Sequence, residues 1–216
     1  MRTLRLHGIR IDAVRDIFGA DDDLASRLRE TAAQHFSPPR RGQAGLLGKL
    51  GPLFTRTPRT EVDARGPLTG DVDALLAGGF IPPERLVPSW RVFSVWLDAL
   101  SRTSTTLTFD DFDDIEFDLA RNGLSSDFSL RQLAEREVSV PLRPLPGQVL
   151  GYSRHLHAVE TRTALLQMRA NPPDHTSLEP ETDALVGTLL EFLGQVAEAG
   201  GDTDVVAFTT DEITRA

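Results

Sequence analysis

The chain has 216 residues, of which 40% are hydrophobic and 25% are charged, a composition typical of a folded domain and not of a disordered protein. Its 23 basic and 32 acidic residues give a net charge of −9, which repels a phosphate backbone and argues against nucleic acid as a partner. The absence of cysteine excludes disulfides, thiolate nucleophiles and cysteine-held zinc or iron–sulfur clusters.

The beginning of the chain predicts a strand followed by helices. Alternating apolar residues indicate a strand over residues 3–11. Helical spacing of apolar residues then predicts a short helix from Asp12 and a longer one from about Asp21, with Leu28 and Ala32 on the buried face of the second.

Residues 37–67 form a Pro-, Gly- and Arg-rich segment. Five prolines and five glycines interrupt any regular element longer than a turn or two. We interpret this segment as a loop inserted into a single domain that spans residues 1–216.

The middle of the chain predicts further helices and one strand. Thr69 begins a short helix that ends at Gly78, and Ser89 begins a strongly amphipathic one. The apolar stripe of that second helix favours burial in a core over a partner groove, and it consists of Trp90, Phe93, Trp96, Leu97 and Leu100. A β-prone run over Thr103–Phe109 predicts a strand, and an acidic helix follows it.

The last part of the chain predicts two short extended or turn segments, two long helices and a final strand. Residues 138–140 are interpreted as a strand and residues 151–153 as a turn before a helix. A long helix over 180–199 and a compact strand over 205–208 complete the chain. The order predicts an α+β fold, with a small sheet that includes the N- and C-terminal strands and is covered by five or six helices.

Six carboxylates within residues 110–118 form the densest polar cluster. Four of them are candidate ligands for a hard cation such as Ca²⁺ or Mg²⁺, namely Asp110, Asp111, Asp113 and Asp114. Their spacing lacks the alternation and the central glycine of a calcium loop. Carboxylates in the first turn of a helix are also stabilised by the helix dipole, and we favour this interpretation.

The histidines offer a second set of candidate metal ligands. A metal site made of two histidines and one carboxylate could draw on His155, His157, Glu160 and the distant His175. We expect a helix here, which places His155 and His157 about 200° apart around the axis, so histidines at the surface or at a rim are the favoured account. A metal-assisted hydrolase is the enzymatic alternative that these residues leave open.

No nucleotide or serine-hydrolase motif is present. The run Gly42-x-x-Gly45-x-x-Gly48-Lys49 has the wrong spacing for a phosphate loop and lacks the Ser or Thr that follows the lysine. We therefore assign no catalytic residue and no cofactor.

The inserted segment carries the candidate partner-binding residues. They are apolar residues flanked by arginines, namely Leu46, Leu47, Leu50, Leu53 and Phe54 with Arg40 and Arg41. Such a segment suits a partner-binding surface or, over residues 46–54, peripheral attachment to a membrane surface. A loop that packs one or two leucines is the simpler alternative.

The sequence favours a non-catalytic binding or regulatory protein of the cytoplasm, with a protein partner. No apolar run approaches the roughly 20 residues that span a bilayer, and the N-terminus lacks a secretion signal. An acidic protein steers basic partners toward itself, as an immunity or antitoxin-type protein does. The identity of the partner and the oligomeric state are not specified by the sequence.

Several short motifs follow one another in a distinctive order, namely residues 75–79, the helix 90–100, residues 140–142 leading to Gly151-Tyr152, and the run 205–208. This order resembles a family of small actinobacterial proteins of uncharacterised function, distantly similar to the single-domain YfbM-like group. The resemblance leaves out residues 37–67 and 109–118. It implies an α+β domain with paired terminal strands, and it brings no catalytic residue.

Overall fold

The computed structural model describes residues 2–36, 66–173, 176–211 and 213, and these residues form an α+β fold as the sequence predicts. A single antiparallel sheet of four strands has the order β2-β1-β4-β3. In chain order the strands are β1 (Arg2–Ile9), β2 (Thr103–Phe109), β3 (Leu150–Ser153) and β4 (Asp204–Thr209). The first and last strands of the chain are therefore the two inner strands of the sheet.

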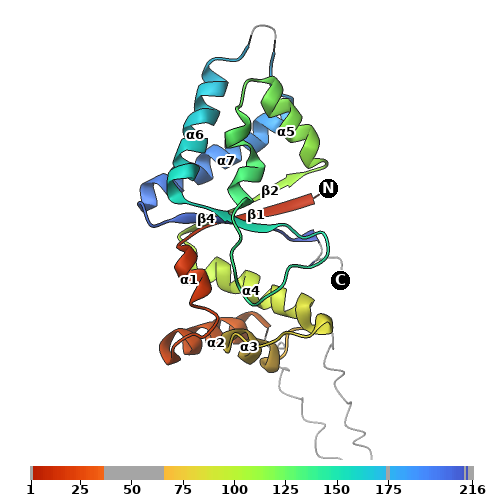
Figure 1. Ribbon diagram of the computed structural model, residues 1–216, viewed down its shortest axis with the longest axis vertical. Helices are drawn as coiled ribbons and strands as arrows, with labels where there is room; N and C mark the ends of the chain where they lie inside the picture. Colours follow the sequence, from red (N-terminus) through yellow and green to blue (C-terminus); the bar gives the residue numbers. More distant parts are fainter. Residues whose placement is uncertain (1, 37–65, 174–175, 212, 214–216) are drawn as a thin grey trace, which may run out of the picture.

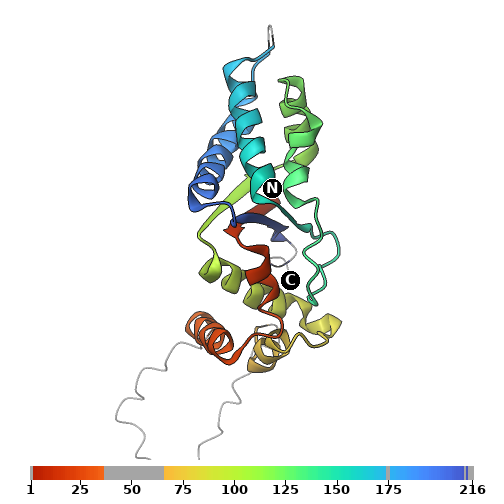
Figure 2. The same cartoon turned by 60° about the vertical axis from the view of Figure 1, so that its left-hand side comes forward.

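Helices cover both faces of the sheet. The seven α-helices in the described ranges are α1 (Ile11–Arg15), α2 (Asp22–Phe36), α3 (Thr69–Leu76), α4 (Leu86–Leu100), α5 (Phe112–Arg121), α6 (His155–Ala170) and α7 (Pro180–Ala199). Three short 3-10 helices are η1 (Pro83–Arg85), η2 (Ser126–Phe128) and η3 (Leu130–Ala134). Figures 1 and 2 show α5, α6 and α7 on one side of the sheet and α1 to α4 on the other.

Each face of the sheet has its own hydrophobic core. Along β4, Val205 and Ala207 pack on the α7 side, whereas Val206 and Phe208 pack on the α4 side. Side chains on a strand alternate between faces, so a strand buried on both sides reads as one continuous apolar run. This explains the compact apolar segment at the end of the sequence. The stripe of Trp90 on α4 is core, as predicted, with its indole N–H donating to the carbonyl oxygen of Arg143 (2.9 Å).

The strand predicted at residues 138–140 is wrong. Val138 is buried like a strand residue, but Ser139 has a φ of 57°, which turns the chain out of the extended conformation. The pairing near this position lies two residues earlier, where Arg136 and Tyr152 form an isolated bridge.

The turn predicted at residues 151–153 is also wrong, because these residues belong to β3. Gly151 lies in the strand where the backbone of Ala134 crosses it, and a Cβ at this position would overlap the carbonyl oxygen of Ala134. The glycine is required by this close approach and not by a turn.

The helix predicted from Ser89 begins earlier, at Leu86, and Ser89 is fully buried inside it. Pro88 is tolerated here because it lies in the first turn, where a backbone N–H has no helical partner. The inserted loop predicted at residues 37–67 lies outside the described residues except for residues 66 and 67.

Asp204 holds the first residues of two helices. One carboxylate oxygen accepts the backbone N–H of Ile11 in α1 (3.2 Å), and the other accepts the N–H of His155 in α6 (3.2 Å). The guanidinium of Arg154 also donates to it (3.4 Å), and the side chain is only 4% exposed. The sequence predicts Asp12 as the cap of α1, but this helix is capped by a residue 193 positions away.

His7 is a buried neutral imidazole in β1. Its Nδ1 lies 3.0 Å from the hydroxyl of Ser101, and its ring stacks on Phe208 with 5.5 Å between centroids. The other ring nitrogen has no hydrogen-bond partner in the described part of the chain. Burial, and secondly the charge of Arg5, lower the pKa of His7 to about 3.

We predict that replacing Asp204 with Ala lowers the free energy of unfolding by about 2 to 4 kcal/mol, because two helix caps and a charged hydrogen bond are lost together. Asp204→Asn keeps one acceptor oxygen and should lose less. Asp202→Asn is the control, since Asp202 is about half exposed and its partners among the described residues are the surface side chains of Arg10 and Arg102. Urea unfolding measures all three variants, and equal losses for Asp204→Ala and Asp202→Asn would contradict the capping role.

We predict that His7 makes the fold sensitive to acid. His7 takes up a proton near pH 6.5 in the unfolded chain and only near pH 3 in the folded chain. The contribution of His7 to the free energy of unfolding is therefore fully present above pH 6.5 and is lost progressively as the pH falls from 6.5 toward 3. One proton bound by the unfolded state alone corresponds to about 1.4 kcal/mol per pH unit. Urea unfolding of the wild type and of His7→Phe at a series of pH values should therefore give a shallower slope for the variant, and parallel slopes would disprove the role of His7.

We predict opposite effects for two Gly→Ala substitutions. Gly151→Ala should destabilise the fold by about 3 kcal/mol or more, because the methyl group collides with backbone. Gly187→Ala, in α7, meets no atom within 4 Å and should stabilise the fold by about 0.5 to 1 kcal/mol. Thermal unfolding compares them, and a tolerated Gly151→Ala would show that the contact with Ala134 relaxes.

Candidate functional site

One side of β2 has no partner strand among the described residues. The N–H of Thr210 donates to the carbonyl oxygen of Thr3 (3.1 Å), so the odd-numbered residues of β1 bond with β4. In an antiparallel ladder both backbone groups of a residue point to the same neighbour, and the even-numbered residues of β1 therefore bond with β2. The residues of β2 whose N–H and C=O groups point away from β1 are Ser104, Thr106 and Thr108.

The sequence of this edge strand contains none of the usual protection against pairing. Proteins commonly keep an edge strand from adding another chain by placing Lys, Pro or a bulge in it. Over Thr103–Phe109 the strand has no charged residue and no proline, and its register with β1 is regular throughout. The side chains of Ser104, Thr106 and Thr108 are exposed. The edge is therefore suited to accept another extended chain.

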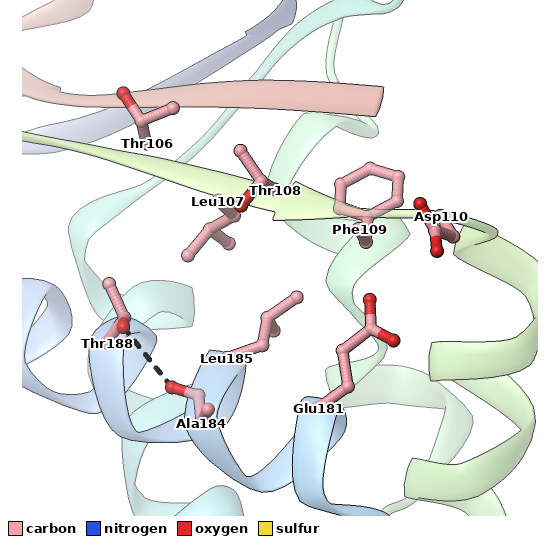
Figure 3. Close-up of a pocket in the computed structure, with 9 residues that line it drawn as sticks. All are labelled: Thr106, Leu107, Thr108, Phe109, Asp110, Glu181, Ala184, Leu185 and Thr188. Carbon is pink, nitrogen blue, oxygen red and sulfur yellow. Dashed lines mark hydrogen bonds between the residues drawn. The ribbon is translucent and has the colours of Figure 1, made fainter. Parts of the chain in front are cut away.

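A groove of about 420 Å³ lies along this edge, between β2 and the first half of α7. This volume lies within the range of ordinary ligand sites. The lining residues are Thr106, Leu107, Thr108, Phe109, Asp110, Glu181, Ala184, Leu185 and Thr188. Figure 3 shows Leu107 and Leu185 pointing into the space between strand and helix, with Glu181 directed toward the end of the strand at Asp110.

Polar contacts tie α7 to β2 near one end of the helix and to α5 at the other. At one end the hydroxyl of Thr103 hydrogen-bonds the side chain of Gln195. At the other, the buried carboxylate of Asp118 accepts the N–H of Glu179, which precedes the first residue of α7 (2.8 Å). Asp118 also pairs with Arg121 (2.7 Å). This hydrogen bond, and secondly the one that Arg121 donates to the side-chain carboxylate of Glu179, raises the pKa of Arg121. The strand and the helix that border the groove are therefore both attached to the rest of the fold.

The groove has an apolar middle and an acidic end. Leu107 and Leu185 are almost fully buried and form its floor, and the hydroxyl of Thr188 is already bonded to the carbonyl oxygen of Ala184 (3.2 Å). At the far end, the exposed Glu181 lies in the first turn of α7, close to the loop residue Asp110. In the part of the chain that the structure describes, no arginine or lysine pairs with Glu181.

The acidic candidates of the sequence lie around the start of α5, and Asp111 and Asp113 have partners there. Asp111 caps α5 by accepting the N–H of Asp113 (2.8 Å), and Asp113 pairs with Arg131. Asp114 is an exposed first-turn residue. Burial raises the pKa of Glu116 on the same helix, although Glu116 accepts the backbone N–H of Arg131 (3.2 Å). These positions are the ones that the helix dipole favours.

The histidine candidates do not meet. His155 hydrogen-bonds the carbonyl oxygen of Thr203 (3.1 Å), whereas His157 stacks on Phe128 with 5.9 Å between ring centroids. Glu160 is exposed and His175 is outside the described residues. Across residues 2–36, 66–173, 176–211 and 213, no three His, Asp or Glu side chains gather in a group that could hold a metal ion. The described residues therefore offer no geometric support for the metal-assisted alternative.

The partner-binding candidates of the inserted segment, from Arg40 and Arg41 to Phe54, lie outside the described residues. Sequence reasoning missed the groove, although it identified the strand that borders it. The signal was present in the uncharged run Thr103–Phe109, which is unusual for an edge strand.

Comparison with known proteins finds no matching family model, no matching curated protein and no matching solved structure. Within the described ranges, no helix combines the length and the apolar character needed to cross a membrane.

Proposed function

We propose that this chain is a non-catalytic binding or regulatory protein of the cytoplasm that captures an extended segment of a protein partner. The segment adds to the open edge of β2 and becomes a fifth strand of the sheet. The single observation that carries the proposal is the uncharged edge strand lying beside a preformed groove.

The backbone of β2 supplies the affinity in this mode of binding. Ser104, Thr106 and Thr108 each direct an N–H and a C=O toward the incoming strand, so a segment of five or so residues completes a regular ladder. Each hydrogen bond formed in exchange for water contributes about 0.5 to 1.5 kcal/mol. The ordered sheet and helix α7 reduce the cost of binding, since only the partner segment must become ordered.

The charge of the chain favours a basic partner. A net charge of −9 attracts cationic proteins and raises their rate of association, and it repels other acidic surfaces. An immunity or antitoxin-type inhibitor that binds a basic protein fits this combination of steering and strand addition.

We predict that Thr106→Pro weakens partner binding about tenfold or more, while Thr106→Val does not. Proline removes the N–H that points to the open edge and introduces a ring there, whereas the ladder bonds to β1 are left in place. Loss of one such hydrogen bond corresponds to about tenfold in affinity. A photo-reactive amino acid at position 108 identifies the bound segment in the native cell, and the corresponding synthetic peptide is then titrated against both variants.

The amide exchange of β2 provides the structural readout. Binding of that peptide should slow the exchange of the Ser104, Thr106 and Thr108 amides in the wild type. Equal affinity for Thr106→Pro and Thr106→Val, or protection confined to another surface, would contradict strand addition at β2. Thermal unfolding checks that both variants remain folded.

A further inference from the structure

The two sides of an added strand would meet different surroundings. The side chains of Leu107 and Phe109 face α7, and those of Thr106 and Thr108 face the opposite, exposed side. Residues opposite each other in neighbouring strands point to the same face, with Cβ atoms about 4.5 to 5.5 Å apart. Every second residue of the partner therefore enters the groove, beginning with those opposite Leu107 and Phe109.

The residue opposite Leu107 would meet an apolar wall. Leu107 and Leu185 have hydrocarbon side chains without polar atoms, and they are 2% and 6% exposed. The hydroxyl of Thr188 donates to the carbonyl oxygen of Ala184 in the same helix, and its methyl group points toward the groove. A polar or charged side chain here would lose water without gaining a partner, which favours an aliphatic residue.

The residue opposite Phe109 would meet negative charge. Glu181 is exposed in the first turn of α7, and no arginine or lysine of the described residues pairs with it. Its carboxylate points toward the end of β2. A lysine or arginine at this position gains charge-assisted hydrogen bonds, whereas an acidic residue is repelled.

The direction of the partner follows from the sheet. All three strand pairs of the sheet are antiparallel, and antiparallel ladders are slightly more stable per residue than parallel ones. In an antiparallel partner, the residue opposite Phe109 comes two positions before the residue opposite Leu107.

We infer that the groove selects partner segments in which a basic residue is followed, two positions later, by an aliphatic residue. This selectivity rests on the proposed strand addition at β2 and specifies which segments can use it. Glu181 and the Leu107–Leu185 floor are its determinants.

The test uses short fluorescent peptides of alternating threonine and serine that carry one lysine and, two positions later, one isoleucine. In a second peptide glutamate replaces the lysine, and in a third the lysine and isoleucine are exchanged. Fluorescence anisotropy should show the first peptide binding at least about tenfold more tightly than the other two, with an affinity that decreases as salt is raised.

Charge reversal in the protein provides the matched control. Glu181→Lys should reverse the preference, so that the glutamate peptide binds more tightly than the lysine peptide. Glu191→Lys makes the same charge change on an exposed position of α7 outside the groove and should leave the preference of the wild type intact.

The two proposals fail in different ways. If the lysine and glutamate peptides bind equally and both protect the Thr106 and Thr108 amides from exchange, the selectivity is wrong and strand addition stands. If no peptide binds, or if peptides bind without protecting these amides, strand addition at β2 is wrong and the selectivity falls with it.

Discussion

The carboxylate of Asp204 joins the sheet to both helical layers. It lies at the first residue of β4, an inner strand, and accepts backbone N–H groups from α1 on one face and α6 on the other. The first N–H groups of a helix have no partner within the helix, and leaving them buried without an acceptor is costly. A single side chain thus satisfies two helix starts and fixes where each layer departs from the sheet. Around these two helix starts, α7 packs on α6 and β2 and carries α5, whereas α4 packs on β1 and carries α2 and α3.

The sequence predicts most elements of this fold because their signals are local. The stripe from Trp90 to Leu100 and the run Val205–Phe208 indicate a helix and a buried strand without knowledge of any neighbour. The failures are where a distant contact decides the conformation. Gly151 looks like a turn residue until the backbone of Ala134 is seen to cross it, and Val138 looks like a strand residue until Ser139 turns the chain. Capping of α1 by Asp204 could not be predicted, because the two partners are 193 residues apart.

In the candidate site, too, some features have a local signal in the sequence and others depend on distant contacts. The β-propensity of Thr103–Phe109 is visible in the sequence, and so is the unusual absence of charge from it. Whether a strand is inner or outer depends on the order of the whole sheet, which places β2 beside β1 and nothing described beside its other edge. A cluster of carboxylates such as that at the start of α5 attracts attention in a sequence, yet here Asp111 caps the helix and Asp113 pairs with Arg131. The groove instead draws its chemistry from residues such as Leu107 and Glu181, which are more than 70 positions apart and individually ordinary.

The pairing of β1 with β4 has a consequence for synthesis of the protein. The inner pair of the sheet joins Leu4 to Thr209, so the chain as far as Thr209 must leave the ribosome before the pair can form. Until then β1 has only β2 as a partner, and the apolar faces of both strands are without their final cover. Contacts between such distant residues form slowly, and nascent chains with exposed strands depend on chaperones to avoid aggregation. The same topology that gives the sheet a protected centre therefore delays completion of the sheet until β4 has been synthesised.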